Sequence, residues 1–266
     1  MVDKEKLIQH IEDPVLKQAM IKVLDKAQTV LKSHEIKATD FLTPHQVQYG
    51  KKLLATLHGI SCYSTGGYEG AERQVLVIFP DYLDESSVEA PIVALEATGS
   101  TQFHSINHRD YLGSILGLGL KREKIGDFLL HEEDQKHFCH MVLHEELKDF
   151  ILFNLEKVGN VKVDLKEIAL DTIIPPEIKY QEFVSNISSL RLDAVLGGGF
   201  KLSRSDAQSL ISKEFVSVNW ETIKKNFYET SEGDVISVRG KGRIHIVSIG
   251  GTTKSGRIKI TMKKPI

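Results

Sequence analysis

The sequence predicts a multidomain α+β chain, and three observations lead to that prediction. Segments with apolar residues at helical spacing alternate with short apolar runs that are typical of strands. The tandem proline in "IIPPEIKYQ" cannot continue a helix or a central strand and so indicates a linker. The balance of charge changes sign beyond that linker. We expect four regions: an N-terminal α/β domain at 1–85, a central α+β domain at 86–172, a linker at 173–183 and a basic C-terminal domain at 184–266.

The first region has the pattern of a small α/β unit. Apolar residues recur at helical spacing over 3–32, where Asp13 caps a helix that Pro14 opens. Thr43 and Pro44 repeat that device for a helix that ends near Gly59. The stretch "ISCYSTGGYEGAERQVLVIFP" then predicts two short strands around a glycine turn, and an acidic loop leads out of the unit.

The central region has the element order β-α-β-β-α-β. The expected elements are a strand at 92–97, a helix at 105–118, a hairpin of strands at 127–131 and 137–142, a helix at 144–158 and a strand at 161–168. The helix at 144–158 has Leu147, Phe150, Ile151 and Leu155 on one face. This order is that of the ferredoxin-like fold, or alpha-beta plait, which RNA-recognition domains share. Those domains stack bases on aromatic residues of their central strands. The third strand here, "HFCHMV", offers Phe138 without a basic and aromatic consensus, so the sequence predicts the topology and gives little support for RNA binding by this domain.

Composition and patterning exclude several classes of protein. The chain is 41% hydrophobic and 26% charged, which is typical of a globular protein with packed cores. No window approaches the 18 or so apolar residues of a membrane-spanning helix, and the N-terminus lacks the apolar stretch of a secretory signal, so we expect no membrane insertion. Cys62 and Cys139 form no CxxC pair and are expected to be reduced thiols of a cytoplasmic protein.

The net charge of −2 hides a strong asymmetry. Residues 1–186 carry 20 Lys and Arg against 29 Asp and Glu, whereas residues 187–266 carry 14 against 7. A basic C-terminal region favours contact with a polyanion, although a basic tail without a partner remains an alternative. The acidic first part is a possible binding surface for a protein partner.

The three consecutive glycines of "SLRLDAVLGGGFKLSRSDAQSLI" have two interpretations. A glycine run before a helix can cradle phosphate, but no P-loop spacing and no preceding strand accompany this one. We therefore expect a turn between two helices, with Gly197 to Gly199 supplying a positive φ where the first helix ends. Ser203 and Asp206 form a pattern like a capping box for the second helix.

The charged residues around this turn are the candidate RNA contacts. Arg191 and Arg204 are expected in the first turns of the two helices, where free N–H groups favour phosphate. The alternative for Arg191 is a pair with Asp193 or Asp206 that holds the helices together. Polar neighbours and basic residues of the later strands complete the predicted RNA-binding set, which is Arg191, Lys201, Ser203, Arg204, Ser205, Gln208, Arg239, Lys241, Arg243, Lys254 and Arg257. Trp220 is expected as a partly buried core residue, with base stacking as its alternative.

The C-terminal region resembles the S-four domain, the alpha-L RNA-binding motif named after a small-subunit ribosomal protein. The segments that carry the resemblance are "RLD", "SRSDAQSLI", "VSVN" and "EGDVISV", in the order of the family and over about 50 residues, at 191–193, 203–211, 216–219 and 232–238. Two positions depart from the pattern: Glu214 stands where the family often has glycine, and Trp220 follows Asn219 where glycine is common. The resemblance implies an RNA-binding domain with tight turns at those two places.

A wider resemblance covers nearly the whole chain. "NHRDYLGSILGLGLKREKIGDFLL" at 107–130, the β-α-β-β-α-β order and a C-terminal S-four domain together resemble the YlmH family of bacterial RNA-binding proteins. That resemblance implies a cytoplasmic, ribosome-associated protein that binds ribosomal RNA or tRNA and has no chemistry of its own. It also implies links to a cell-division gene neighbourhood and to the rescue of stalled large ribosomal subunits that carry peptidyl-tRNA.

Two other functions stay open at this point. One is an RNA-modifying enzyme that its S-four domain positions, and the other is a cell-division adaptor whose acidic part binds a protein. Residues 1–186 contain no catalytic Asp loop, dinucleotide glycine motif or ATP-binding His motif, so we expect no enzymatic activity and no cofactor. Four histidines lie close together in the sequence, His131, His137, His140 and His144. They predict no metal site, because His137 and His140 have an odd separation on one strand and so point to opposite faces.

Overall fold

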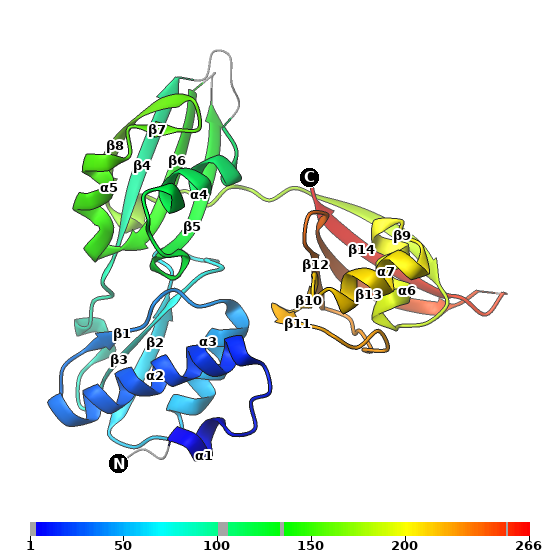
Figure 1. Cartoon of the computed structure of the whole chain (residues 1–266), viewed down its shortest axis with the longest axis horizontal. Helices are drawn as coiled ribbons and strands as arrows, with labels where there is room; N and C mark the ends of the chain where they lie inside the picture. The colour runs from blue at the N-terminus through cyan, green and yellow to red at the C-terminus, as the bar shows by residue number, and fades with distance from the viewer. Residues whose placement is uncertain (1–3, 101–105, 134–135, 254) are drawn as a thin grey trace. The chain divides into compact units, whose positions relative to one another are not determined.

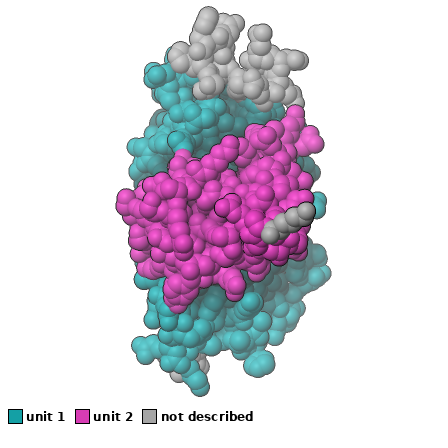
Figure 2. Space-filling view, turned by 90° about the vertical axis from the view of Figure 1, so that its right-hand side faces the viewer, with its two compact units in different colours: residues 1–176 teal, residues 177–266 magenta. Residues whose placement is uncertain are grey.

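The chain divides into two compact units. The computed structural model describes residues 4–100, 106–133, 136–253 and 255–266. The two units are residues 1–176 and 177–266, coloured teal and magenta in Figure 2. The first contains the predicted N-terminal and central regions, and the second contains the basic C-terminal region.

The N-terminal part of the first unit consists of helices beside a small antiparallel sheet with the order β1-β3-β2 (Figure 1). Its elements are α1 Lys4–Ile8, α2 Pro14–Ser33, β1 Lys37–Ala38, α3 Pro44–Leu54, β2 Ile60–Thr65, β3 Val75–Pro80 and the 3-10 turn Glu85–Ser87. Both predicted helix starts are confirmed, because Asp13 accepts the N–H of Val15 at 2.9 Å and Thr43 forms a reciprocal capping box with Gln46. Strand β1 was not predicted, since two residues are too few to show a period.

Strand β3 is buried on both faces and joins the two parts of the first unit. Leu76 and Ile78 pack into the core formed with α2 and α3. Val75, Val77 and Phe79 pack into a second core that also contains central strand residues. A strand covered on both faces reads as one apolar run, which explains the sequence "VLVIF".

A hydrogen-bond network around Asp127 ties the same two parts together. The Asp127 carboxylate accepts the Tyr68 hydroxyl at 2.9 Å and the backbone N–H groups of Glu72 and Arg73. The Arg73 side chain donates to the carbonyl oxygens of Ile125 and Phe41 at 3.0 and 2.9 Å. Burial and the nearby Arg122 charge lower the pKa of Arg73 to about 10. The loop at 66–74 is thereby fixed against the central part of the unit.

The central part of the first unit has a five-stranded antiparallel sheet with the order β5-β6-β4-β8-β7. Its elements are β4 Ile92–Ser100, α4 His108–Gly117, the 3-10 turn Arg122–Lys124, β5 Ile125–Glu133, β6 Lys136–His144, the 3-10 turn Glu145–Leu147, α5 Lys148–Asn154, β7 Lys157–Val158, β8 Val161–Ile168 and the 3-10 turn Leu170–Thr172. Helices α4 and α5 contribute Tyr111, Ile115 and Ile151 to the core on one face of the sheet. Asn107 and Asp110 cap α4 reciprocally.

Two predicted helices of the central region differ from the structure. The helix expected at 144–158 is only Lys148–Asn154, because His144 ends strand β6 and Lys157–Val158 forms strand β7. Phe150, expected on its apolar face, is 43% exposed, since the shorter helix turns Ile151 toward the core. The helix expected at 105–118 begins at His108, and Ser105 lies outside the described residues.

The second unit is a six-stranded antiparallel sheet with two helices on one face (Figure 1). Its elements are β9 Tyr180–Ile187, α6 Leu192–Phe200, α7 Arg204–Ser212, β10 Val216–Val218, β11 Glu221–Thr222, β12 Val235–Val238, β13 Gly242–Thr252 and β14 Ile258–Pro265, and the strand order is β11-β10-β12-β13-β14-β9. Leu192, Val195 and Ile211 of the helices pack against Ile244 and Met262 of the sheet. Strand β9 begins at Tyr180, inside the segment expected as a linker, and pairs with β14 along its length.

The segment "EFVSVNWETI" at 214–223 has the alternation that is typical of a single strand, but it forms a hairpin of the two short strands β10 and β11. Asn219 and Trp220 form its turn with φ of 50° and 66°, and Glu214 before β10 has φ 60°. The Asn219 side chain donates to Asp234 at 2.8 Å and accepts the N–H of Val235 at 2.9 Å. These bonds hold Asn219 in the left-handed region. The chain therefore turns tightly at Glu214 and at Trp220 although neither residue is glycine.

Candidate nucleic-acid interface

The three glycines lie inside helix α6, and this corrects the prediction that they form the turn. The chain reverses at Lys201, which caps the helix with φ 54°. A Cβ on Gly198 would lie 2.7 Å from Ser185 Oγ and 2.8 Å from Ile187 Cγ2. A Cβ on Gly199 would lie 2.4 Å from Ile244 Cδ1, whereas one on Gly197 would meet nothing closer than 3.4 Å. The last turn of α6 therefore needs glycine because it approaches the sheet closely.

Helix α7 starts beside this approach, as predicted. Ser203 is its N-cap and accepts the N–H of Asp206 at 3.1 Å, and the Ser203 hydroxyl contacts the Asp206 carboxylate at 2.6 Å. Arg204 and Ser205 occupy the first turn, and both side chains are exposed. The N–H groups of a helix N-terminus carry partial positive charge and favour an anion.

Asp193 is a buried carboxylate between the two helices. It accepts bonds from Arg191 Nε and Nη2 at 3.1 and 3.0 Å and from Gln208 Nε2 at 3.0 Å, and Arg204 Nε lies at 3.4 Å. Burial alone would raise the pKa of Asp193, but the bonds from Gln208 and Arg191 and the two arginine charges lower it below its ordinary value. Arg191 is thus paired with Asp193, which was the alternative to a contact with RNA, and Gln208 donates to the same carboxylate. Arg204 is 72% exposed and is the more accessible of the two arginines.

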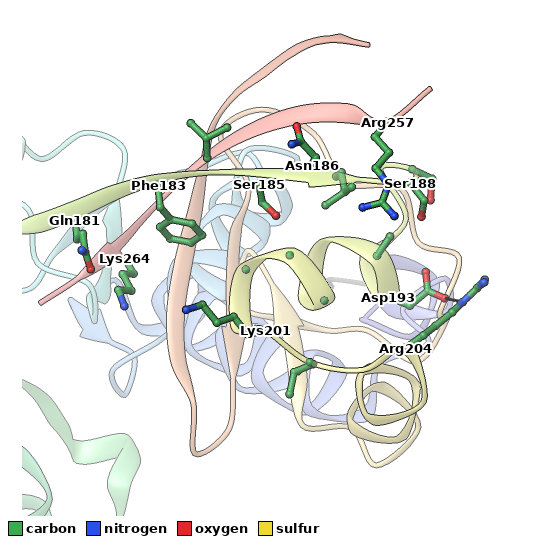
Figure 3. Close-up of a pocket in the computed structure, with 18 residues that line it drawn as sticks. Gln181, Phe183, Ser185, Asn186, Ser188, Asp193, Lys201, Arg204, Arg257 and Lys264 are labelled. Carbon is green, nitrogen blue, oxygen red and sulfur yellow. Dashed lines mark ion pairs between the residues drawn. The ribbon is translucent and has the colours of Figure 1, made fainter. Parts of the chain in front are cut away.

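A groove of about 780 Å³ runs between β9 and α6. Four cations lie around it, Lys201, Arg204, Arg257 and Lys264, with Asp193 joined to Arg204 at one end (Figure 3). Hydroxyl groups of β9 and the following turn line the same groove and supply neutral donors and acceptors; they are those of Ser185, Ser188 and Ser189. Because its carboxylate is paired with arginine, the groove presents a surplus of positive charge and hydrogen-bond donors, which is the chemistry that binds phosphate.

The structure separates the predicted RNA-binding residues into two groups. Lys201, Arg204 and Arg257 line the groove, with Ser203 and Ser205 at the adjacent start of α7. A second group lies on the β12–β13 turn and the strands that leave it, and consists of Arg239, Lys241 and Arg243. Lys254 lies outside the described residues.

Sequence reasoning missed the part of the groove that β9 forms. Lys264, Ser185 of β9 and Ser188 just after it line the groove but are not among the predicted RNA-binding residues. The signal was the alternation of Phe183, Ser185 and Ile187 on one face, which the preceding prolines obscured.

The predicted histidine cluster lies on the sheet of the first unit. His140 is 2% exposed, lies 3.3 Å from Glu96 and contacts the rings of His131 and Phe138. His137 pairs with Gly99 in the strand register. Within the described ranges, no group of three or more His, Cys, Asp and Glu is arranged to hold a metal ion.

Comparison with known proteins places this architecture in a family. The family model described as "YlmH, N-terminal" matches residues 16–83, and the one described as "Putative RNA-binding domain in YlmH" matches residues 88–172. A protein of Bacillus subtilis, named ribosome-associated protein quality control protein P2, is 30% identical over 91% of this chain and 92% of its own. The chain belongs to the YlmH family.

A solved structure supports the membership in the YlmH family. The cell division protein ylmH from Streptococcus pneumoniae has a TM-score of 0.51 and is 25% identical to this chain, covering 61% of this chain and 96% of its own. The two family models cover segments of the first unit, whereas the relative from Bacillus subtilis is similar over nearly the whole chain. Among the described residues of this YlmH-family chain, no helix has the length and apolar character needed to span a bilayer.

Proposed function

We propose that this protein binds structured RNA, either ribosomal RNA or tRNA, through the groove between β9 and α6. The observation that carries the proposal is the set of cations around that groove, Lys201, Arg204, Arg257 and Lys264, beside the N-terminus of α7. Phosphates are bound by such cations and by backbone N–H groups, whatever the base sequence. Shape and backbone contacts are also how proteins recognise folded RNA.

The fold supports the proposal in both units. We infer that the second unit is an S-four domain, which its paired helices α6 and α7 and the following hairpins support. We infer that the central part of the first unit is a ferredoxin-like domain, which the order β5-β6-β4-β8 and the helices on one face support. The description of the matching family model supports an RNA contact there as well.

We further propose that the RNA is on the large ribosomal subunit and that the role is rescue of stalled translation in the cytoplasm. The name of the relative from Bacillus subtilis supports an association with ribosomes and with protein quality control. The proposal includes no catalytic step, and the protein acts by occupying its RNA site. Its partners are then the large subunit and the RNA at its surface, and it needs no cofactor.

Crosslinking of the protein in cells followed by sequencing of the bound RNA tests the choice of RNA. Recovery of ribosomal RNA or tRNA segments is expected with the wild type, and fewer of them with Arg204→Ala. Lys213→Ala is the matched control, because Lys213 is exposed at the other end of the same helix. Equal recovery with Arg204→Ala and Lys213→Ala would contradict a role for the groove.

Mass spectrometry of nucleosides tests the absence of catalysis. RNA from cells with and without the protein is expected to carry the same modifications. A modification that is lost with the gene and restored by purified protein would establish an RNA-modifying enzyme instead.

A further inference from the structure

The helix-free face of the second unit's sheet has a composition unlike that of the helix-covered face. Ile244 and Ile246 of β13 point into the core with α6 and α7, so Arg243 and His245 lie on the opposite face. The strand register places Ser237 of β12 opposite Arg243 and Lys263 of β14 opposite His245. Alternation along β9 and β10 adds Tyr180 and Phe215 to the same face.

Cations and aromatic rings are paired across this face. The Arg239 guanidinium lies 5.2 Å from the centre of the Phe215 ring, and that of Arg243 lies 5.1 Å from Trp220. The Lys263 ammonium lies 4.5 Å from the Tyr180 ring. Each pair holds a flat aromatic surface beside a positive charge.

These pairs form a stripe that crosses five neighbouring strands, β10, β12, β13, β14 and β9. Adjacent strands are about 4.8 Å apart, so the stripe extends roughly 20 Å across the sheet. His245 lies edge-on to Tyr180 at 5.4 Å and fills the interval between two of the pairs. A hollow of about 290 Å³ beside Arg239 is lined by Ser217, Thr222 and Ser237 among others.

The charge of the stripe favours an anionic partner. Three cations lie along it. The acidic residues beside them are Glu182, opposite Lys263 in the strand register, and Glu214, which lines the hollow beside Arg239 and pairs with Lys224 at 3.0 Å. An acidic protein segment would need the cations and not the rings. Unpaired bases need both, since they stack on aromatic rings and on arginine planes while their phosphates contact cations.

We propose that this face binds a single-stranded segment of RNA by base stacking, separately from the groove. Double-stranded RNA keeps its bases stacked on one another and offers none to the rings. The second unit then contacts RNA on two faces, with phosphates of a folded segment in the groove and unpaired bases on the sheet. The proposal does not depend on the groove being an RNA site.

Binding of a uridine oligonucleotide and of a blunt RNA duplex to the full chain tests the proposal. Trp220 is the single tryptophan, so its fluorescence reports on this face directly. The oligonucleotide is expected to quench that fluorescence, and Tyr180→Ala is expected to weaken its binding about ten-fold, within the range for loss of one stacked base. Affinity for the duplex should not change with Tyr180→Ala.

Matched variants separate stacking from charge and from folding. Tyr180→Phe keeps the ring and should bind the oligonucleotide like the wild type, whereas Lys263→Gln should weaken binding mainly at low salt. Arg204→Ala should weaken binding of the duplex and preserve the quenching of Trp220 by the oligonucleotide. Melting curves identify any variant that fails to fold. Quenching of Trp220 in the wild-type protein by the oligonucleotide, and not by the duplex, then carries the test.

Two results would overturn the proposal. One is unchanged Trp220 fluorescence together with equal oligonucleotide affinity for the wild type and Tyr180→Ala. The other is a poly-glutamate peptide that binds as tightly as the oligonucleotide and loses affinity with Lys263→Gln but not with Tyr180→Ala, which would identify an acidic protein as the partner. Loss of duplex binding alone, with the oligonucleotide still bound, would count against the groove and not against this face.

Discussion

Arg191→Ala is expected to lower stability and Arg204→Ala to lower RNA affinity, although both arginines contact the same carboxylate. Arg191 donates two bonds of 3.1 and 3.0 Å to Asp193, whose side chain is 2% exposed. A hydrogen bond to a charged group contributes about 1.5–3 kcal/mol. Because Arg191 is itself 39% exposed and Gln208 and Arg204 still contact Asp193, we expect Arg191→Ala to cost about 2 kcal/mol in total.

That cost is large enough to measure. For a unit of this size about 2 kcal/mol lowers the melting temperature by roughly 8–16 °C. Arg204 is 72% exposed and contacts Asp193 through Nε at 3.4 Å, so Arg204→Ala should cost less than about 1 kcal/mol. Its effect should appear in RNA affinity, where the slope against salt falls by about one because one phosphate contact is lost.

Melting curves and RNA titrations at several salt concentrations, on the wild type and both variants, distinguish the two roles. The expected result is a sharp fall in melting temperature for Arg191→Ala and a reduced salt slope for Arg204→Ala. If Arg191→Ala melts like the wild type and binds RNA with a reduced salt slope, the structural assignment of Arg191 is refuted.

Three further predictions concern the same unit. Asp193→Asn should destabilise the protein at neutral pH, and because the pKa of Asp193 is lowered by folding, the difference from wild type should shrink as the pH of the melting assay falls below about 4. Gly198→Ala should destabilise by about 1–3 kcal/mol through its clash with β9. Gly197→Ala, where the added Cβ would meet Leu202 O at an ordinary contact distance of 3.4 Å, should stabilise by up to about 1 kcal/mol in denaturant titrations. A fragment of residues 177–266 should fold and bind RNA with strong salt dependence. A shorter fragment of residues 188–266 lacks β9, and circular dichroism should show that it does not fold.

Local rules predicted the helix starts that have a capping side chain better than they predicted the end of α6. Asp13, Thr43 and Ser203 cap helices as expected, because a cap depends on a few neighbouring residues. The end of α6 depends on contact with β9, which lies before it in the chain, so the glycine run was assigned to a turn that Lys201 makes instead. Asn219 held its left-handed conformation through Asp234, a partner that sequence alone does not reveal.

The candidate site was predicted in part for the same reason. Arg204 lies in a segment that carries the S-four resemblance, Lys201 was selected as a basic residue beside the helix turn, and both line the groove. Lys264 joins them only because β14 pairs with β9, and such a pairing between distant segments leaves no periodic signal. The burial of Asp193 likewise results from tertiary packing. Because Asp193 is buried, Arg191 and Gln208 pair with it and stabilise the fold.

The Asp127 network has a consequence for how the first unit unfolds. Tyr68 and Arg73 from one part hold backbone and carboxylate groups of the other, and both faces of β3 are covered by different cores. Losing either part would expose an apolar face of β3 and leave the Asp127 carboxylate without its donors. Residues 1–176 are therefore expected to unfold as one calorimetric event, with an enthalpy of roughly 120 kcal/mol near 60 °C for a unit of that length. The two segments that separate family models recognise should then share a single cooperative transition.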